Sequence, residues 1–212
     1  MNKYDLWLFD CDGVILDSND LKTEAFRQIG MGYGSREAEA LVRYHVTYGG
    51  VSRYEKLDYF FRGIRGETQY GDKLRAALGE YAQVVSVGLR ECAEIPGVRE
   101  FLERLRRIEG VRTFVVSGSD EEELRDVFRD RGLSRYFDGI LGAPAKKREI
   151  VSRLCAGEHD GGAVPRAVFC GDSRLDYEVA VECGIRFIMV YGYTEWEGWR
   201  EAIPRTIVRV RD

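Results

Sequence analysis

The sequence predicts an α/β protein in which a helical insertion separates the first strand of a parallel β-sheet from the other strands. The segment Leu6–Phe9 is a short apolar run without alternation, which is typical of a parallel strand covered on both faces. Helix-length segments separated by glycines follow it, and from Pro96 onward helices and strands alternate. We therefore expect a core formed by residues 1–17 and 93–212, with residues 18–92 inserted as a helical domain.

Composition indicates an ordinary soluble globular protein. Of the 212 residues, 44% are hydrophobic and 32% are charged, and the net charge of −4 offers no basic surface for nucleic acid. No charged-then-apolar leader and no apolar run of membrane-spanning length is present, so we expect a cytoplasmic protein without membrane contacts. The 5 cysteines include no C-x-x-C pair, which argues against both disulfides and structural zinc. The sequence does not indicate the oligomeric state.

The insertion is predicted to consist of amphipathic helices. Their apolar positions are Leu21 to Ile29 for a helix ended by Gly30, Leu41 to Tyr44 for one ended near Gly49 and Gly50, Leu57 to Phe61 for a third, and Leu74 to Val84 for a fourth. Ser52 is the expected N-cap of the third helix, with Glu55 as its capping-box partner. We interpret the many aromatic residues of this region as its core and rim rather than as a ligand cage.

The later part of the chain supplies the remaining elements of the predicted sheet. Helices are expected through Val98 to Leu105, Glu121 to Arg131, Lys147 to Cys155, and up to Gly184; strands are expected at Thr113 to Val116, Gly139 to Leu141, Ala167 to Cys170 and Phe187 to Val190, with a last edge strand at Ile207 to Val210. This regular order predicts a parallel sheet.

An acidic pair follows the first strand directly. Because strand side chains repeat every second residue, Asp10 and Asp12 face the same way while Cys11 points oppositely. Gly13 allows a sharp turn that swings Asp12 over the group that Asp10 faces. Cys11 is better interpreted as a small buried residue than as a nucleophile. Taken alone, the pair is equally compatible with an acidic turn.

Further polar residues follow the other predicted strands. Ser117 comes after Val115-Val116, Lys147 shortly after Ile140-Leu141, and Asp172 after Phe169-Cys170-Gly171. The carboxyl ends of parallel strands meet at one edge of the sheet, where open α/β sheets bind their ligands. We therefore expect these side chains to share one crevice with the acidic pair.

These residue types are suited to phosphoryl transfer. Asp10 would attack phosphorus and form an aspartyl-phosphate, and Asp12 would protonate the leaving oxygen and then take a proton from water. Because several carboxylates would repel a phosphate, the site requires a hard cation such as Mg²⁺, with Asp10 and Asp172 as side-chain ligands. Lys147 would neutralise developing charge, and the Ser117 hydroxyl and the following amides, beginning with Gly118, would donate to phosphoryl oxygens.

Two serine-acid pairs have the spacing of capping boxes. Ser119 with Glu122 is expected to cap one helix, and Ser173 with Asp176 another. Asp176 therefore has three interpretations: it caps its helix, orients Lys147, or touches a metal-bound water.

The chain resembles the haloacid dehalogenase superfamily in four motifs, which occur in the order of the family. These are Asp10-Cys11-Asp12-Gly13-Val14, Ser117 in Val115-Val116-Ser117-Gly118-Ser119, Lys147 in Gly142-Ala143-Pro144-Ala145-Lys146-Lys147, and Gly171-Asp172-Ser173-Arg174-Leu175-Asp176. The resemblance implies a Rossmann-like three-layer core, Lys147 rather than Lys146 as the active lysine, and Mg²⁺ ligation by the backbone carbonyl of Asp12. It also implies that the insertion is a mobile α-helical cap, similar to that of the phosphoglycolate phosphatase and beta-phosphoglucomutase branch.

Two insertion residues are candidates for substrate specificity. The segment Gly49-Gly50-Val51-Ser52-Arg53 is similar to a cap loop that, in beta-phosphoglucomutase relatives, carries an arginine contacting a sugar phosphate; the alternative for Arg53 is a solvated arginine in the first turn of a helix. Lys22 stands where mutases of this branch tend to have histidine, which weakens the mutase interpretation.

We therefore predict a Mg²⁺-dependent phosphatase that hydrolyses a small phosphorylated metabolite, either a sugar phosphate or a phospho-acid. A beta-phosphoglucomutase-like phosphomutase is the alternative enzyme. A phosphoacceptor signalling domain is less favoured, because such modules lack a long helical insertion. A catalytically inactive binding protein is disfavoured because no catalytic position is substituted.

Overall fold

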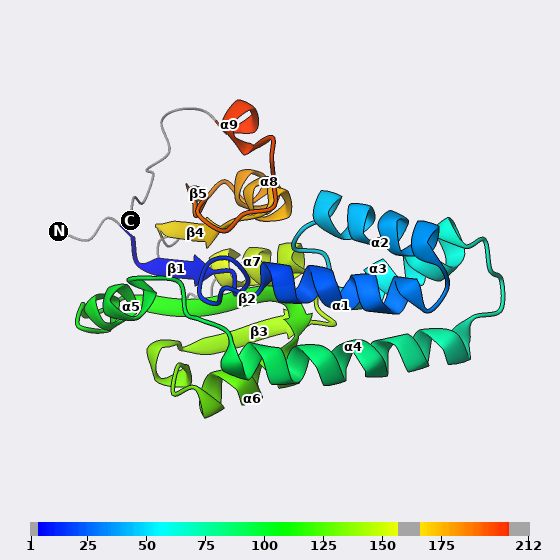
Figure 1. The fold of residues 1–212 in the computed structure, drawn as a ribbon. Helices are drawn as coiled ribbons and strands as arrows, with labels where there is room; N and C mark the ends of the chain where they lie inside the picture. Colours follow the sequence, from blue (N-terminus) through cyan, green and yellow to red (C-terminus); the bar gives the residue numbers. More distant parts are fainter. Residues whose placement is uncertain (1–3, 157–165, 204–212) are drawn as a thin grey trace.

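A computed structural model describes residues 4–156 and 166–203 of the chain (Figure 1). Its centre is a parallel sheet of 5 strands in the order β3-β2-β1-β4-β5, which confirms the predicted fold class. The strands are β1 (Leu6–Phe9), β2 (Arg112–Asp120), β3 (Gly139–Ala143), β4 (Ala167–Gly171) and β5 (Arg186–Met189). The edge strand predicted at Ile207 to Val210 lies outside the described residues.

The first strand lies in the middle of the sheet. Leu6 pairs with Arg112 of β2 on one side and with Ala167 of β4 on the other, and all residues of β1 are buried. Leu6 and Leu8 pack into one hydrophobic cluster, whereas Trp7 and Phe9 pack into a second cluster on the opposite face. An unbroken apolar run is therefore required here, and the residues that follow β1 emerge at the centre of the sheet's carboxyl edge.

Helices on both faces complete a three-layer core. Side chains of α5 (Val98–Arg106) and α6 (Glu121–Asp130) share the cluster of Trp7, and those of α7 (Lys147–Ala156) and α8 (Arg174–Glu182) share the cluster of Leu6. A 3₁₀ turn at Ser134–Tyr136 and a short helix α9 (Trp199–Ala202) complete the described elements. No helix in the described ranges is long and apolar enough to cross a membrane.

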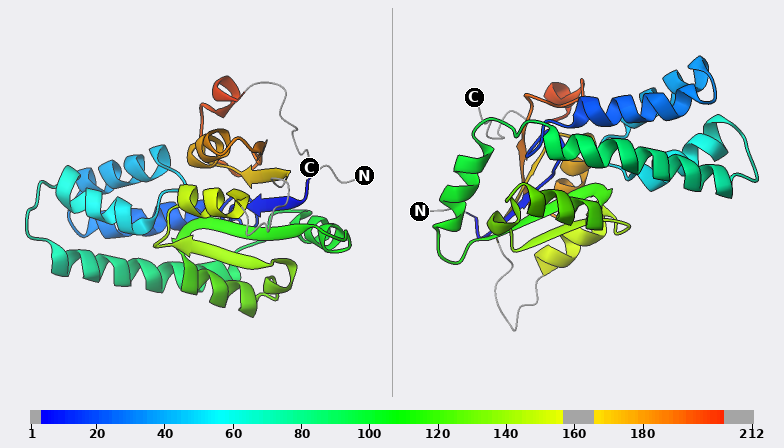
Figure 2. Two further views of the ribbon diagram at one scale, coloured as in Figure 1. Left: turned by 180° about the vertical axis from the view of Figure 1, so that it is seen from behind. Right: turned by 60° about the horizontal axis from the view of Figure 1, so that its bottom comes forward.

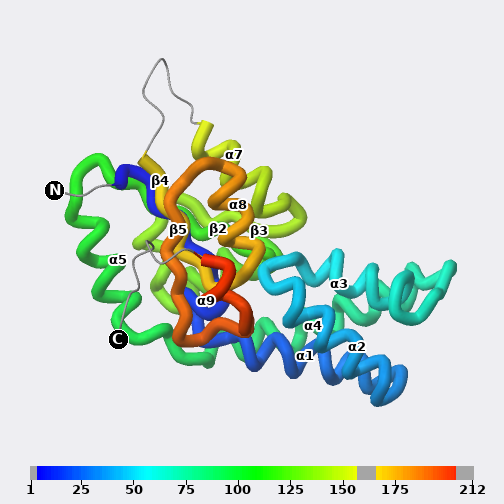
Figure 3. The backbone as a smooth tube through the Cα atoms, turned by 90° about the horizontal axis from the view of Figure 1, so that it is seen from above, coloured from blue at the N-terminus to red at the C-terminus, as the bar shows by residue number. Residues whose placement is uncertain are grey.

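The helical insertion comprises the helices between β1 and β2. These are α1 (Asn19–Met31), α2 (Ser35–Thr47), α3 (Arg53–Tyr59), which continues into a π-helical turn at Phe60–Ile64, and α4 (Gly71–Glu91). Figure 2 shows from two further directions that the insertion extends beyond one end of the sheet, and Figure 3 shows α5 on the opposite side of the strands from α7 and α8. Phe60 and Phe61 are fully buried within the insertion, as expected for core aromatics.

Some predicted boundaries are wrong: α1 continues past Gly30 to Met31, β3 continues past Leu141 to Ala143, and the end of β2 differs most. Strand β2 extends beyond its predicted end at Val116 to Asp120, with a shift in its pairing with β3 between these residues. The N-cap of α6 is Asp120, whose side chain accepts the backbone N–H of Glu123 at 3.0 Å, so Ser119 is not the cap. An aspartate caps a helix as well as a serine does, and the later cap leaves the Ser119 hydroxyl facing the carboxyl edge of the sheet.

Candidate active site

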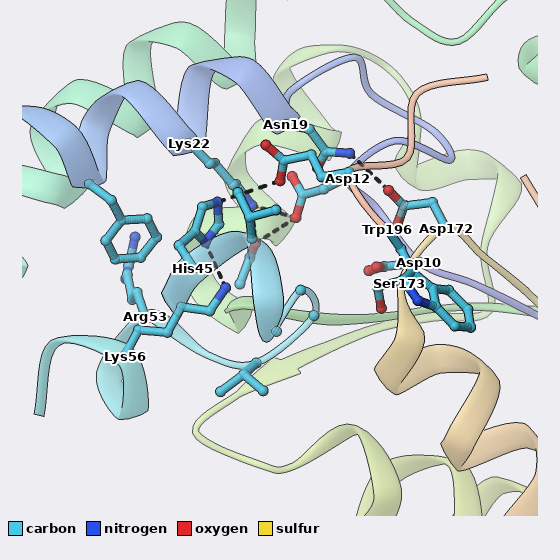
Figure 4. A pocket seen from close by; sticks show the side chains of 18 of the residues that line it. Asp10, Asp12, Asn19, Lys22, His45, Arg53, Lys56, Asp172, Ser173 and Trp196 are labelled. Atoms are coloured by element: carbon cyan, nitrogen blue, oxygen red, sulfur yellow. Dashed lines mark hydrogen bonds and ion pairs between the residues drawn. The ribbon is translucent and has the colours of Figure 1, made fainter. Parts of the chain in front are cut away.

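A pocket lies between the carboxyl edge of the sheet and the helical insertion. Asp10, Asp12 and Asp172 line its core side, and the insertion contributes its basic side chains (Figure 4). The insertion residues include Asn19, Lys22, Phe26, His45, Arg53, Lys56 and Tyr81, and the loop after β5 adds Thr194, Glu195 and Trp196. The core side of the pocket is therefore acidic and the insertion side basic.

Asp10 follows β1 at the base of this site and is only 2% exposed. Its Oδ1 accepts the backbone N–H of Cys11 at 2.7 Å, and its Oδ2 lies 2.7 Å from Nζ of Lys147. Burial raises the pKa of Asp10 to about 7, with the Asp176 carboxylate acting in the same direction and Lys147 opposing both. The fixed orientation of the carboxylate leaves it suited to attack an electrophile, provided that more positive charge is supplied.

Lys147 begins α7 and connects Asp10 to Asp176. Its Nζ lies 2.6 Å from Oδ1 of Asp176 in addition to its contact with Asp10, whereas Lys146 is exposed. Burial disfavours the charged amine, but the Asp10 and Asp176 carboxylates overcome this and raise the pKa of Lys147. Lys147 is therefore a fixed cation beside the predicted nucleophile.

Asp176 both caps its helix and contacts Lys147, which are two of the three roles considered for it. Its Oδ2 accepts the backbone N–H of Ser173 at 3.1 Å and the Ser173 hydroxyl at 2.7 Å, which forms the predicted capping box at the start of α8. Its Oδ1 accepts from Lys147. One carboxylate thus anchors both the helix and the lysine.

Asp10, Asp172 and Asp176 form an acidic cluster that is suited to a metal ion. Each offers an oxygen within 4.8 Å of the others. Burial, followed by the nearby Asp10 and Asp176 carboxylates, raises the pKa of Asp172, and Asn19 Nδ2 donates to Asp172 Oδ2 at 2.8 Å. Buried hard oxygens are the donor set that Mg²⁺ prefers, and three carboxylates share the single Lys147 cation, so the residues present fit this ion.

Asp12 is bound by the insertion. Lys22 of α1 places its Nζ 2.5 Å from Asp12 Oδ2 and donates to the Ser119 hydroxyl at 2.5 Å, while the Ser18 hydroxyl donates to Asp12 Oδ1 at 2.6 Å. Burial alone would raise the pKa of Asp12, but the Lys22 charge outweighs it and the pKa is lowered. Lys22 was predicted as a specificity residue. In the structure it contacts Asp12, the predicted general acid and base.

The turn after Asp12 requires glycine. Gly13 has a φ of +68°, and a Cβ at this position would lie 2.4 Å from Asp172 Oδ2. Asp12 and Asp172 can therefore approach the same point only because this residue has no side chain.

The loop between α2 and α3 packs directly on the predicted phosphate-binding segment. A Cβ at Gly118 would lie 2.3 Å from the carbonyl oxygen of Gly50, and a Cβ at Gly50 would lie 3.2 Å from Lys147 Nζ. Ser117 is fully buried, and its hydroxyl accepts the N–H of Ser119 at 3.1 Å. The insertion is thus closed over the site in this structure.

Arg53 is not the solvated residue that one interpretation predicted. It is 8% exposed, and its Nη1 lies 2.7 Å from Oε2 of Glu123 in the first turn of α6. The neighbouring Tyr54 hydroxyl donates to Asp120 Oδ2 at 2.7 Å. Arg53 is buried because α3 packs against the start of α6, where acidic side chains gather, and it also lines the pocket.

Among the pocket residues that sequence analysis did not single out, three polar residues lie together. Lys56 of α3 and His45 of α2 are buried side by side, with Nζ and Nδ1 2.7 Å apart, and Glu195 lies beside them. The only sequence signal was the scarcity of lysine, which makes a lysine within an amphipathic helix conspicuous.

Comparison with known proteins identifies relatives over most of the chain. Residues 7–190 match the family model described as haloacid dehalogenase-like hydrolase. A phosphorylated carbohydrates phosphatase of Thermotoga maritima is 27% identical over 188 residues, covering 87% of this chain and 83% of the relative. A phosphoglycolate phosphatase of Pseudomonas putida is 28% identical over 199 residues, covering 89% and 70%.

Solved structures share the fold. The crystal structure of CbbY from Rhodobacter sphaeroides in complex with phosphate matches with a TM-score of 0.70 and 20% identity, covering 98% of this chain and 93% of the other. A subfamily IA hydrolase of the same superfamily from Geobacter sulfurreducens matches with a TM-score of 0.56 and 26% identity, covering 88% and 87%. The likeness extends over both the sheet and the helical insertion.

Proposed function

The chain belongs to the haloacid dehalogenase-like hydrolase family, and on this premise we propose that it is a Mg²⁺-dependent phosphatase acting through an aspartyl-phosphate on Asp10. The named relatives are phosphatases, which confirms the predicted enzyme class of phosphoric monoester hydrolase. The observation that carries the proposal is the Asp10 carboxylate, 2.7 Å from Lys147 and grouped with Asp172 at the carboxyl edge of the sheet.

Asp10 and Asp172 would hold the metal ion with their side chains, and the Asp12 carbonyl would join them as the family resemblance implies. When bound, Mg²⁺ supplies positive charge that lowers the repulsion between the carboxylates and a phosphate ester. Lys147 adds a second, permanent cation at 2.7 Å from Asp10. Ser117 and the Gly118 amide would orient the phosphoryl oxygens.

In the first half-reaction, an Asp10 oxygen forms a bond to phosphorus while the bond to the ester oxygen breaks, and Asp12 gives its proton to that oxygen. In the second, water attacks the phosphorus, Asp12 takes a proton from it, and the bond to Asp10 breaks to release phosphate. The ion pair of Asp12 with Lys22 corresponds to the ionised form of Asp12, which is the form that accepts the proton from water.

We further propose that residues 18–92 act as a mobile cap over a core formed by residues 1–17 and 93–212. Closure would exclude water from the first half-reaction, and opening would release the product. The substrate is a small phosphorylated metabolite, a sugar phosphate or a phospho-acid. This class is supported by the relatives, which are named for phosphorylated carbohydrates and phosphoglycolate.

The test is release of phosphate from para-nitrophenyl phosphate and from a panel of phosphorylated metabolites. We expect activity with Mg²⁺, loss of activity with a chelator, and a decrease of more than about 10³-fold in Asp10→Asn. Asp72→Asn is the matched control, since Asp72 is exposed at the start of α4 and does not line the pocket. Full activity in Asp10→Asn, or none in the wild type across the panel, would refute the proposal; an isomerised sugar phosphate would identify a mutase.

A further inference from the structure

The cations on the insertion side of the pocket are not equivalent. Lys22 is paired with Asp12 and Arg53 with Glu123, at 2.5 and 2.7 Å. Lys56 is 2% exposed, yet no carboxylate in the described ranges lies within 4.0 Å of its Nζ. A buried cation without an ion-pair partner is unfavourable for folding, so its presence in a ligand pocket calls for an explanation.

The only hydrogen-bond partner of Lys56 within the described part of the chain is a neutral ring. Its Nζ lies 2.7 Å from Nδ1 of His45, and since an ammonium group only donates, Nδ1 accepts and the ring hydrogen is on Nε2. His45 is 7% exposed and its Nε2 has no hydrogen-bond partner among the described residues. The two side chains thus present N–H donors next to each other.

The surroundings hold this pair in place without neutralising it. Phe26 lies beneath both residues, with Nζ of Lys56 at 5.6 Å and the His45 ring at 4.5 Å from its centroid. Glu195 also lies beside the pair, but its Oε2 is 3.8 Å from His45 Nε2, beyond hydrogen-bond range, and its Oε1 accepts the Thr23 hydroxyl at 2.6 Å. No carboxylate is therefore paired with Lys56, and the donors of both side chains remain available to a ligand.

Lys56 and His45 line the same cavity as Asp10 and Asp12, on the opposite side (Figure 4). Burial, followed by repulsion from Lys22, lowers the pKa of Lys56 to about 7, which is the direction expected for a cation that lacks a counter-charge. An anion beside Nζ would reverse this effect and satisfy the Nε2 donor of His45 as well.

We propose that Lys56 and His45 form a subsite for a carboxylate carried by the substrate at the end opposite its phosphoryl group. A carboxylate has two oxygens that accept from two neighbouring donors and a single charge that matches a single ammonium. A second phosphate would bring a further negative charge beside Glu195, and Lys22 and Arg53 are already neutralised by Asp12 and Glu123. This inference rests on the proposed phosphatase function and specifies its substrate as a phosphorylated carboxylic acid.

The test compares esters that differ only at the distal group. The pairs are 3-phosphoglycerate with glycerol 3-phosphate, and 2-phosphoglycolate with 2-hydroxyethyl phosphate. For wild type we expect kcat/KM to favour the acid of at least one pair by about 10- to 100-fold, which is the contribution of hydrogen bonds to a charged group. Lys56→Met should abolish this preference, whereas Lys73→Met, which removes an exposed lysine of α4, should retain both the preference and the hydrolysis of para-nitrophenyl phosphate.

Binding of the same pairs to the Asp10→Asn variant, measured by calorimetry with Mg²⁺, gives a readout that does not require turnover. The acid should bind more tightly than the alcohol, and the added Lys56→Met substitution should equalise the two. Equal binding of acid and alcohol in both pairs, or an equal loss of both in Lys56→Met, would overturn the subsite even if phosphatase activity is present. A preserved preference in binding without turnover would instead refute only the proposed function. If circular dichroism shows that Lys56→Met is unfolded, His45→Gln replaces it, with a reduced preference expected.

Discussion

Replacing Lys56 by methionine should change how the stability of the protein depends on pH. The side chain is 2% exposed, and methionine has a similar length without the charge. The folded-state pKa of about 7 lies below the ordinary value of 10.5, and this difference corresponds to about 5 kcal/mol of destabilisation when the amine is charged in both states. Lys56→Met should therefore be more stable than wild type at pH 7.

The sign of the effect follows from where each state holds the proton. Below pH 7 the folded and the unfolded protein both carry it, and the folded state bears the full cost of the buried charge. Between pH 7 and 10.5 only the unfolded chain carries it, so the stability of wild type relative to the variant increases with pH. From pH 7 to pH 9 this relative gain is about 2 kcal/mol, because the slope reaches its full value of about 1.4 kcal/mol per pH unit only once the folded state has lost the proton.

Urea unfolding of both proteins, followed by circular dichroism at pH 7, 8 and 9, measures this gain directly. Lys73→Met provides the matched control, because it removes an exposed lysine from the same insertion. Using the pH dependence of the difference cancels any change in packing that methionine introduces. If the free energies of unfolding of wild type and Lys56→Met changed with pH in the same way, the Lys56 amine would be fully compensated in the folded protein. Lys56 would then not be an unpaired buried cation.

Further predictions concern the contacts between the insertion and the core. Lys22→Met should lower the free energy of unfolding at pH 7 by about 3 kcal/mol in urea titrations, because it leaves the Asp12 carboxylate buried without its partner at 2.5 Å; a loss below about 0.5 kcal/mol would contradict this. Gly118→Ala should lower kcat/KM for para-nitrophenyl phosphate by more than about tenfold, because its Cβ would lie 2.3 Å from the Gly50 carbonyl oxygen. Gly79→Ala, in open space on α4, is the control: it should gain about 0.5–1 kcal/mol and keep full activity, whereas unchanged kinetics in Gly118→Ala would argue against tight closure.

The core of the fold was predictable because its signals are local. The run Leu6–Phe9 has no polar residue, and a strand that is paired on both edges and covered on both faces admits none. Parallel strands bring their carboxyl ends to one edge, so Asp10 and Asp172 had to approach each other whatever the details of the loops. The choice between Lys146 and Lys147 required the family resemblance, because the two lysines are adjacent at the start of α7 and the sequence does not fix which of them faces the site.

The contacts made by the insertion were not predictable in this way. Amphipathic spacing places Lys56 on a helix but does not say which surface α3 packs against, and the partner of Arg53 is a residue of α6 far along the chain. The cap of α6 shows a second limit. Ser119 and Asp120 are adjacent and both are good N-cap residues, so only the pairing of β2 with β3 decides between them.

The arrangement of charges also bears on which cation selects the substrate. An anion that contacted Arg53 would have to compete with Glu123, which holds the guanidinium at 2.7 Å in a buried setting. Lys22 faces the same competition from Asp12, and losing that contact would disturb the predicted acid and base. Lys56 meets no such competitor, because its described partner is the neutral His45 ring. We therefore expect Arg53 and Lys22 to stabilise the closed position of the insertion, and the discrimination between acidic and neutral phosphate esters to depend on Lys56.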